Sequence, residues 1–433
     1  MKTKHIIIAT LFLAGLLNAC KEKSENPEDG RGAADFTKYI AVGNSLTAGF
    51  ADNGLYLEGQ LTSYPNLLAG QFKASGGGDF VQPLFSEAQA NGSGYLKLVA
   101  FKANGSPDIQ FVAENRAVRG NTTPNPLLNL LGELYTKFTQ PINNLGVPGI
   151  RLSDITDTDY GSKNPFYERL LGESEQNKTY LKKIEESKPT FFTCWLGNND
   201  VLQYAASGGL VPITPEAAFE QLYTTVLNTL TKERAKGVVA TVPDITTIPY
   251  FTLVSKNSIQ AAVPGTNKPE IYITTGTGQV RPIQEGDLIT LAADSIGVAR
   301  NFDTPSGTVA VPKGFSPVYP LDNSDVLDVS EVAVAQQTIV AYNAIIRAAA
   351  TSRKLAFVDA DALIKLFQTP QTLDGVVVST DFISGGLFSL DGVHLTPRGY
   401  AIVANAFIAA INLQYQASIK PVNVSAYRAV KLP

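Results

Sequence analysis

The side chains best suited to chemistry lie in two short segments far apart in the sequence. Ser45 stands on a glycine-flanked turn, Gly43-Asn-Ser-Leu-Thr-Ala-Gly49, directly after an apolar run. His394 is the only histidine besides His5, and Asp391 lies just before it in Asp-Gly-Val-His. A neutral imidazole accepts a hydroxyl proton near neutral pH, and a carboxylate orients the ring. These residue types predict Ser45 as nucleophile, His394 as its base and Asp391 as the orienting acid.

Four sequence blocks resemble the SGNH/GDSL hydrolases, a family of esterases and lipases. They are Gly43-Asn-Ser45-Leu, Asn144-Leu-Gly-Val-Pro-Gly149, Gly197-Asn-Asn199-Asp and the Asp-x-x-His loop that ends at His394. The matches fall in the family's order and spread across most of the chain. The resemblance implies that the N–H of Ser45, the N–H of Gly149 and the side-chain amide of Asn199 form the oxyanion hole.

The chemistry of acyl transfer fits these assignments. The reaction needs hydrogen-bond donors where the oxyanion forms, and the loss of one typically costs about a hundredfold or more in rate. A side chain at Gly149 would obstruct the approaching carbonyl, and the amide of Asn199 donates without titrating. One departure is Asn44, where the family usually has aspartate. Because asparagine keeps an acceptor oxygen for the turn, we expect activity to be retained.

Other interpretations of these residues remain open at this stage. Ser45 is an ordinary turn serine in one of them, whereas a phosphate-binding loop is disfavoured because the Gly-Lys-Ser/Thr ending of that motif is absent. His394 has a structural alternative as a buried core histidine. Asn199 has one as a turn or capping residue, and Gly149 as a residue needed only for backbone shape.

The N-terminus resembles the export signal of a bacterial lipoprotein. Lys2 and Lys4 precede an apolar run, Ile6 to Leu17, that is too short to cross a bilayer as a helix. The run ends in Leu17-Asn-Ala-Cys20, which is similar to a lipobox. We expect residues 1–19 to be the signal peptide, Cys20 to carry lipid and residues 20–36 to form a tether. The expected location is the periplasm or the cell surface, on a membrane; the alternative is an ordinary secreted protein.

Composition excludes several classes of function. Removing residues 1–19 takes away two lysines and no acids, so 33 basic residues remain against 39 acidic ones, a net charge of −6. This balance argues against nucleic acid as a partner. One remaining histidine and no cysteine cluster predict no metal, and the chemistry requires no organic cofactor. With Cys20 acylated, Cys194 has no disulfide partner, and we expect it to be a small buried side chain.

Short apolar runs alternate with helical patterns along the chain. The expected strands are Tyr39 to Val42, Ile142 to Leu145, Thr190 to Leu196, Val238 to Val242 and Leu355 to Val358. Continuous apolar runs are typical of strands buried on both faces of a parallel sheet. We therefore predict an α/β fold, a three-layer α/β/α sandwich with a mostly parallel, flavodoxin-like sheet.

Three helices are readable between and after these strands. Thr214 is the expected N-cap of the first, whose apolar stripe is Phe219, Leu222, Val226 and Leu230 and whose expected end is Gly237. The second carries Val334, Thr338, Tyr342, Ile345 and Ala349 on one face. Thr396-Pro397 opens the third, with Ile402, Val403, Phe407 and Ile411 among its inward residues.

Two long segments interrupt this alternation. Residues 51–140 and 253–325 are rich in Gly, Thr and Pro, and we expect both to be insertions into a single hydrolase domain, residues 37–414, followed by a tail at 415–433. Long insertions are commonly functional, so we place them beside the active-site mouth, with decoration away from it as the alternative.

The sequence therefore predicts a membrane-anchored serine esterase or lipase that acts through an acyl-enzyme on Ser45. Two alternatives remain: a carbohydrate acetylesterase of the same chemistry, and a non-catalytic surface lipoprotein that binds glycans or lipids. The acyl and alcohol parts of the substrate, the membrane leaflet, the oligomeric state and the role of the insertions stay open.

Overall fold

The computed structural model describes residues 29–103, 105–123, 132–266 and 268–433. The predicted signal peptide, 1–19, and the predicted lipid attachment site, Cys20, lie outside this part of the chain. Within it, no helix combines the length and the apolar character that a membrane span requires.

A parallel sheet forms the centre of the molecule. Its strands are β1 (Tyr39–Gly43), β6 (Phe191–Trp195), β7 (Lys236–Ala240) and β14 (Ala356–Val358), in the order β1-β6-β7-β14. Every residue of β1 and β6 is buried, which is why these strands are apolar without alternation. The prediction of a mostly parallel α/β sheet is confirmed.

The fifth expected strand, Ile142 to Leu145, is reduced to a single parallel bridge between Ala41 and Asn144. Its asparagine side chains bond elsewhere: Asn144 Nδ2 donates to the Thr47 carbonyl and to Gln82 Oε1, at 2.9 Å each. Local side-chain bonding of this kind competes with regular strand pairing. The segment still lies along the free edge of β1.

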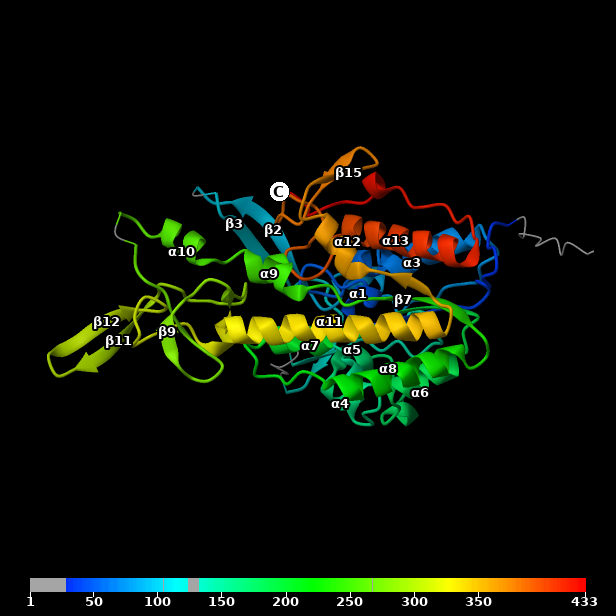
Figure 1. The fold of residues 1–433 in the computed structure, drawn as a ribbon, viewed down its shortest axis with the longest axis horizontal. Helices are drawn as coiled ribbons and strands as arrows, with labels where there is room; N and C mark the ends of the chain where they lie inside the picture. The colour runs from blue at the N-terminus through cyan, green and yellow to red at the C-terminus, as the bar shows by residue number, and fades with distance from the viewer. Residues whose placement is uncertain (1–28, 104, 124–131, 267) are drawn as a thin grey trace, which may run out of the picture.

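Helices cover both faces of the sheet (Figure 1). One layer contains α3 (Tyr64–Lys73) and α13 (Pro397–Tyr415), and the other contains α6 (Tyr180–Ser187), α8 (Glu216–Thr231) and α11 (Val329–Ser352). The predicted three-layer sandwich is therefore confirmed. Shorter helices are α2 (Leu57–Leu61), α4 (Tyr160–Lys163), α5 (Pro165–Glu168), α9 (Pro249–Thr252), α10 (Lys256–Ala262) and α12 (Ala360–Leu366).

The last helix begins as its sequence predicts, because the Thr396 side chain accepts the N–H of Gly399 and Pro397 occupies the first turn. Both ends of α8 differ from the prediction. At its start, the Thr214 hydroxyl donates to Asp200 instead of capping the helix. At its end, the helix stops at Thr231, and Gly237 belongs to β7.

The helix expected around residues 334–349 is α11, but its buried stripe is rotated in the first half. Ala335 and Ile339 are buried there, and Val334 is exposed. Helix α3 was not predicted, because it lies inside the segment assigned to an insertion. Its residues Tyr64, Leu68 and Phe72 belong to the main core.

Short antiparallel hairpins make up most of the two segments assigned to insertions. In the first they are β2 (Tyr95–Phe101) with β3 (Pro107–Val112), and β4 (Val118–Asn121) with β5 (Glu133–Tyr135). In and around the second, the pairs are β8 (Tyr272–Thr274) with β9 (Val280–Pro282), β10 (Leu288–Ile289) with β13 (Val326–Leu327), and β11 (Ala299–Thr304) with β12 (Gly307–Pro312). A further pair, β15 (Gln371–Leu373) with β16 (Val376–Val378), precedes the histidine loop.

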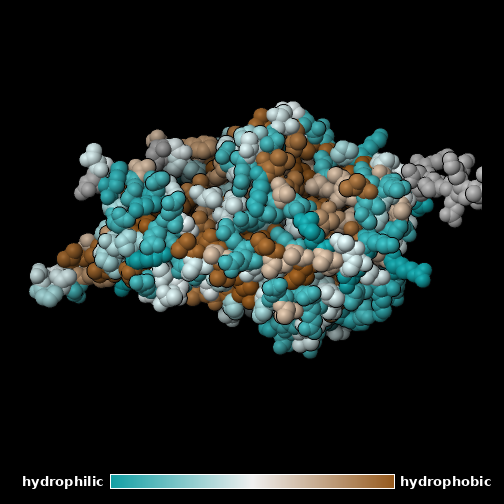
Figure 2. Space-filling view, in the orientation of Figure 1, coloured by the Kyte–Doolittle hydropathy of each residue, from teal (hydrophilic) through white to brown (hydrophobic). Residues whose placement is uncertain are grey.

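The segment 253–325 projects from one end of the sandwich (Figure 1). Ile271, Ile273, Ile283, Ile289, Leu321 and Val326 form a small core separate from the main one. Figure 2 shows apolar surface at this end, which carries the exposed side chains of Val298 and Val309. This unit is therefore an outgrowth with its own packing.

Both ends of the described chain pack on the domain. In the segment assigned to the tether, Phe36 is buried and stacks on Phe72, with ring centroids 4.1 Å apart. In the segment assigned to the tail, Ile419 and Val422 are buried, and their backbone N–H groups donate to asparagines of α13. Residues 29–36 and 416–424 thus contribute to the folded core.

Candidate active site

Ser45 is the first residue of α1 (Ser45–Ala48), which begins directly after β1. The Asn44 side chain accepts the N–H of Leu46 at 3.0 Å, so asparagine supplies the acceptor that this turn requires. Gly43 is needed because a Cβ there would lie 2.0 Å from Thr47 Oγ1. The strand end and the cap together fix the position of Ser45.

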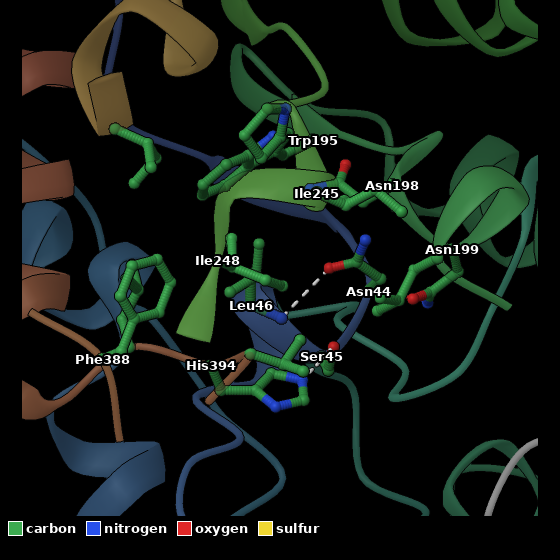
Figure 3. A pocket seen from close by; sticks show the side chains of 15 residues that line it. Asn44, Ser45, Leu46, Trp195, Asn198, Asn199, Ile245, Ile248, Phe388 and His394 are labelled. Atoms are coloured by element: carbon green, nitrogen blue, oxygen red, sulfur yellow. Dashed lines mark hydrogen bonds between the residues drawn. The ribbon is translucent and has the colours of Figure 1, made fainter. Parts of the chain in front are cut away.

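Ser45, His394 and Asp391 form one hydrogen-bonded chain. The Ser45 Oγ lies 2.8 Å from His394 Nε2, and Nδ1 of the same ring lies 2.9 Å from Asp391 Oδ2. The ring of Phe50 packs against the imidazole, with centroids 4.6 Å apart. Figure 3 shows the side chains of Ser45 and His394 turned toward each other. This geometry allows His394 to take the serine proton while Asp391 holds the ring.

The Asp391 side chain is 9% exposed, and its carboxylate is surrounded by donors. Besides the imidazole, it accepts the N–H groups of Val393, His394 and Asn53 at 2.8 to 2.9 Å. Burial alone would raise the pKa of Asp391, but His394 and these hydrogen bonds outweigh burial and hold the pKa well below its usual value. Asp391 is therefore ionised at neutral pH.

A tight turn from the first insertion supports this carboxylate, a contact that was not predicted from the sequence. Asp52 and Asn53 have φ values of 51° and 58°, and Ala51 and Gly54 exchange backbone hydrogen bonds at 2.9 and 3.0 Å. The turn aims the Asn53 N–H at Asp391. Asp-Asn-Gly is a sequence that favours positive φ, so the turn itself was readable, although its partner was not.

Asp52 ties the same turn to the loop that carries His394. Its carboxylate accepts the Leu390 N–H at 3.0 Å and the Tyr56 hydroxyl at 2.8 Å, and its own N–H donates to Ser389 Oγ at 2.9 Å. Burial raises the pKa of Asp52 above its ordinary value, against the lowering effect of these bonds. Residues 52–53 and 389–391 are thus cross-linked by reciprocal hydrogen bonds.

The residues expected at the oxyanion hole meet at the same edge of the sheet. Asn199 lies in the first turn of α7 (Asn198–Ala206), and its Nδ2 donates to the Ile150 carbonyl at 2.9 Å. Gly149 has a φ of 82°, a conformation that favours glycine, and its carbonyl accepts from Gln203 Nε2 at 2.8 Å. An amide nitrogen carries two N–H bonds, so Asn199 has a second one to offer a ligand.

Asp200 anchors the loop that follows Gly149. It is fully buried, and its carboxylate accepts the Leu152 N–H at 2.7 Å and the Thr214 hydroxyl at 2.6 Å. Burial raises the pKa of Asp200 to about 6, against the lowering effect of these two bonds. Asp200 belongs to the block Gly197-Asn-Asn199-Asp, but its anchoring role was not predicted from the sequence.

Two cavities meet at Ser45. One, with a free space of about 50 Å³, is lined mostly by apolar side chains and reaches into the core. The other, with a free space of about 520 Å³, is a wider cleft whose lining includes Asn53 from the first insertion and Ser324 and Asp325 from the second. Residues from both segments assigned to insertions therefore line this cleft.

Two other expectations concern cysteine and metal. Cys194 is a fully buried side chain of β6, as predicted. Within the part of the chain that is described, no group of His, Cys, Asp and Glu side chains has the arrangement of a metal site.

Comparison with known proteins places the chain in a family. The family profile described as GDSL-like Lipase/Acylhydrolase matches residues 39–407. The chain therefore belongs to the GDSL-like lipase/acylhydrolase family and is by class a serine hydrolase of ester bonds, as the resemblance in its sequence indicated. No curated protein matched the sequence.

Several solved structures are similar at low identity. An α/β hydrolase from the metagenome of Lake Arreo, Spain, has a TM-score of 0.38 at 12% identity, over 89% of this chain and 99% of that one. An acetylxylan esterase from Geobacillus stearothermophilus has a TM-score of 0.35 at 12% identity, over 89% and 98%. A lipase/acylhydrolase from Enterococcus faecalis has a TM-score of 0.34 at 13% identity, over 89% and 98%.

Proposed function

We propose that the protein is a membrane-anchored serine esterase that hydrolyses carboxylic esters through an acyl-enzyme on Ser45. The observation that carries the proposal is the hydrogen-bonded chain from Ser45 through His394 to Asp391, at 2.8 and 2.9 Å. Neither a metal nor an organic cofactor is needed for this chemistry.

Acylation begins with attack of Ser45 Oγ on the ester carbonyl. His394 Nε2 takes the hydroxyl proton and then delivers it to the leaving alcohol, while Asp391 stabilises the imidazolium. The bond to the alkoxy oxygen breaks as the acyl group becomes attached to Ser45. Water, activated by the same imidazole, then releases the carboxylic acid and restores the serine.

The oxyanion of both steps would be bound by the N–H of Ser45, the N–H of Gly149 and the second N–H of Asn199. The hydrogen bond from Asn199 to the Ile150 carbonyl supports this role because it holds the amide in one orientation before substrate arrives. Preorganised donors of this kind are usually the largest single contribution to such catalysis.

The test of nucleophile identity is Ser45→Ala with a soluble p-nitrophenyl ester. We expect kcat to fall by about a millionfold, as for nucleophiles of other serine hydrolases, and labelling by a fluorophosphonate probe to disappear. Ser162→Ala is the matched control, because Ser162 is exposed and its hydroxyl donates to the carbonyl of Asp159, the residue just before α4. Full turnover by Ser45→Ala would refute the proposal.

Membrane attachment is the second part of the proposal, with lipid on Cys20 after removal of residues 1–19. It is supported by the lipobox-like segment Leu17-Asn-Ala-Cys20. Expression in a bacterial host should send the full chain to the membrane fraction and to the detergent phase. Cys20→Ala should move it to the soluble fraction, and an unchanged distribution would contradict lipidation.

A carbohydrate acetylesterase of the same chemistry is a second candidate. The wide cleft favours it, because Asn53, Gln203, Ser207, Ser324 and Asp325 present polar groups there. Release of acetate from acetylated xylan, measured beside p-nitrophenyl esters, separates the two candidates. A non-catalytic binding protein, the remaining alternative, would leave the fluorophosphonate probe unreacted.

A further inference from the structure

A narrow apolar pocket opens directly beside the nucleophile. Its wall is mostly apolar and carries polar side chains only from Asn44, Ser45, Asn198, Asn199 and His394 (Figure 3). Six large apolar side chains come from α1, the end of β6, the turn after β7, α12 and the histidine loop: Leu46, Trp195, Ile245, Ile248, Ile364 and Phe388. We call this cavity the apolar pocket. The free space inside it is about 50 Å³, which admits a narrow chain of several methylene-sized groups but no bulky group.

The apolar pocket ends inside the protein. Trp195, Ile245 and Phe388 are at most 3% exposed. The one polar group of Trp195 is already used, because its Nε1 donates to the Thr241 carbonyl at 2.9 Å. A polar ligand part placed against this wall would lose its hydrogen bonds to water without replacement, whereas an alkyl chain would gain by burial.

The wide cleft on the other side of Ser45 is mixed in character, with apolar side chains such as Phe50 and Leu202 beside polar ones. Its lining includes the polar side chains of Gln203, Ser207 and Asp325 and the hydroxyl-bearing ring of Tyr250. Ser45, Asn199 and His394 line both spaces, so the reacting carbonyl would sit between them.

The order in which bonds break indicates which part of the substrate occupies each of the two cavities. The acyl group stays bonded to Ser45 after the alcohol has left, so it can occupy a pocket that ends in the core. The alcohol must leave, and water must reach His394, before the second step, so both need the open side.

We infer that the apolar pocket binds the acyl group of the substrate and the wide cleft its polar alcohol. The substrate class is then an ester of a short-to-medium aliphatic acid, butanoyl to octanoyl, with a hydroxyl-rich alcohol such as a sugar. This inference rests on the proposed function and narrows it. Acetyl is too small to use the pocket, and a long fatty acyl chain does not fit within it.

The first test is a series of p-nitrophenyl esters from acetyl to palmitoyl. Burial of each added methylene is expected to raise kcat/KM by about fourfold until the pocket is full, and longer chains are expected to react more slowly. A maximum between butanoyl and octanoyl supports the inference. A maximum at acetyl, or a steady rise to palmitoyl, would overturn it.

The second test fills the pocket. Ile248→Trp should reduce kcat/KM for octanoyl by at least tenfold and leave acetyl within about threefold, because only the acyl chain competes for that space. Leu413→Trp is the matched control, since Leu413 is 86% exposed on α13 and lines neither the apolar pocket nor the wide cleft. It should leave the chain-length profile unchanged. Equal losses for acetyl and octanoyl in Ile248→Trp would contradict the assignment.

A third variant covers the case in which the tryptophan disturbs folding. Ile364→Ala enlarges the apolar pocket at α12 and should move the maximum to longer acyl chains. An unmoved maximum would count against the inference. Failure of the proposed function has a different signature. In that case no ester is hydrolysed and the fluorophosphonate probe does not label Ser45, whatever the acyl chain.

Discussion

Asp391 receives an unusually complete set of hydrogen bonds for a single carboxylate. The backbone N–H groups of Asn53, Val393 and His394 and the imidazole converge on it. Because each donor favours the charged form, this residue stays an anion while largely buried. An anion at this point selects the imidazole tautomer whose Nε2 faces Ser45 with a lone pair.

Replacement of Asp391 by asparagine tests that role. An amide N–H at this position favours the wrong imidazole tautomer, so we expect kcat to fall by about ten-thousandfold with little change in KM. The measurement is steady-state hydrolysis of a p-nitrophenyl ester, with circular dichroism to check the fold. A loss of less than tenfold would rule out Asp391 as the orienting acid.

Acidification gives a second prediction at the residue scale, for Asp200. Its pKa is raised to about 6 in the folded protein by burial, compared with an ordinary value near 4. Between about pH 4 and pH 6, the folded state therefore binds more protons at this position than the unfolded state does. The stability that this carboxyl contributes is complete below about pH 4 and is lost as the pH rises through about 6, by up to about 3 kcal/mol.

Asp200→Asn should remove this dependence, because the amide oxygen still accepts from Leu152 and the amide nitrogen can donate to Thr214. Urea unfolding at pH 4 to 7 measures the difference between wild type and variant. Asp200→Asn should gain stability relative to wild type as the pH rises. Asp294→Asn, at an exposed position, is the control. A pH-independent difference for Asp200→Asn would contradict the raised pKa.

At the scale of elements, the turn Ala51–Gly54 links the first insertion to the histidine loop. It uses two consecutive residues in the left-handed region, a conformation that costs energy for residues other than glycine. This conformation lets the Asn53 N–H donate to Asp391 and lets the Asp52 carboxylate accept the Leu390 N–H. The turn therefore positions the acid from outside its own loop.

Asp52→Ala should lower kcat by about tenfold to a hundredfold with KM nearly unchanged, since misplacement of a catalytic group costs about that much. Asp52→Asn keeps an acceptor for Leu390 and should restore most of the rate. Asp374→Ala is a matched control: Asp374 also has positive φ and accepts a backbone N–H, from Val424, away from the site. Equal losses in Asp52→Ala and Asp374→Ala would indicate a general effect on folding.

At the scale of the whole molecule, the start of the described chain and the active site lie at opposite edges of the sheet. The Lys38 N–H donates to Thr190 Oγ1 at the amino ends of β1 and β6, whereas Ser45 follows the carboxyl end of β1. Figure 1 shows the first described residues at the end of the molecule away from the segment 253–325. A tether entering there would leave the wide cleft facing away from its anchor.

This arrangement predicts that the proposed lipid anchor does not affect turnover of soluble esters. The full chain in detergent micelles and a soluble form that starts at Asp29 should have kcat/KM values within about twofold for p-nitrophenyl butanoate. The measurement compares both forms after active-site titration with the fluorophosphonate probe. A large difference would mean that the anchored end reaches the cleft.

Local patterns carried much of the fold and the identity of the reacting groups. Strands buried on both faces must be apolar throughout, which is why β1, β6, β7 and β14 were readable. The cap at Thr396 marked the start of α13 because one side chain completes it. His394 was identifiable because histidine is so rare in this sequence.

Contacts between distant segments were decided only by tertiary structure. His394 contacts Ser45 although 349 positions separate them in the sequence, and no local pattern predicts that contact. The contact between Asn53 and Asp391, the burial of Asp200 and the core position of α3 also depend on which segments meet in space. Periodicity and capping report on neighbours along the chain, whereas burial and the walls of the two cavities arise from packing between elements.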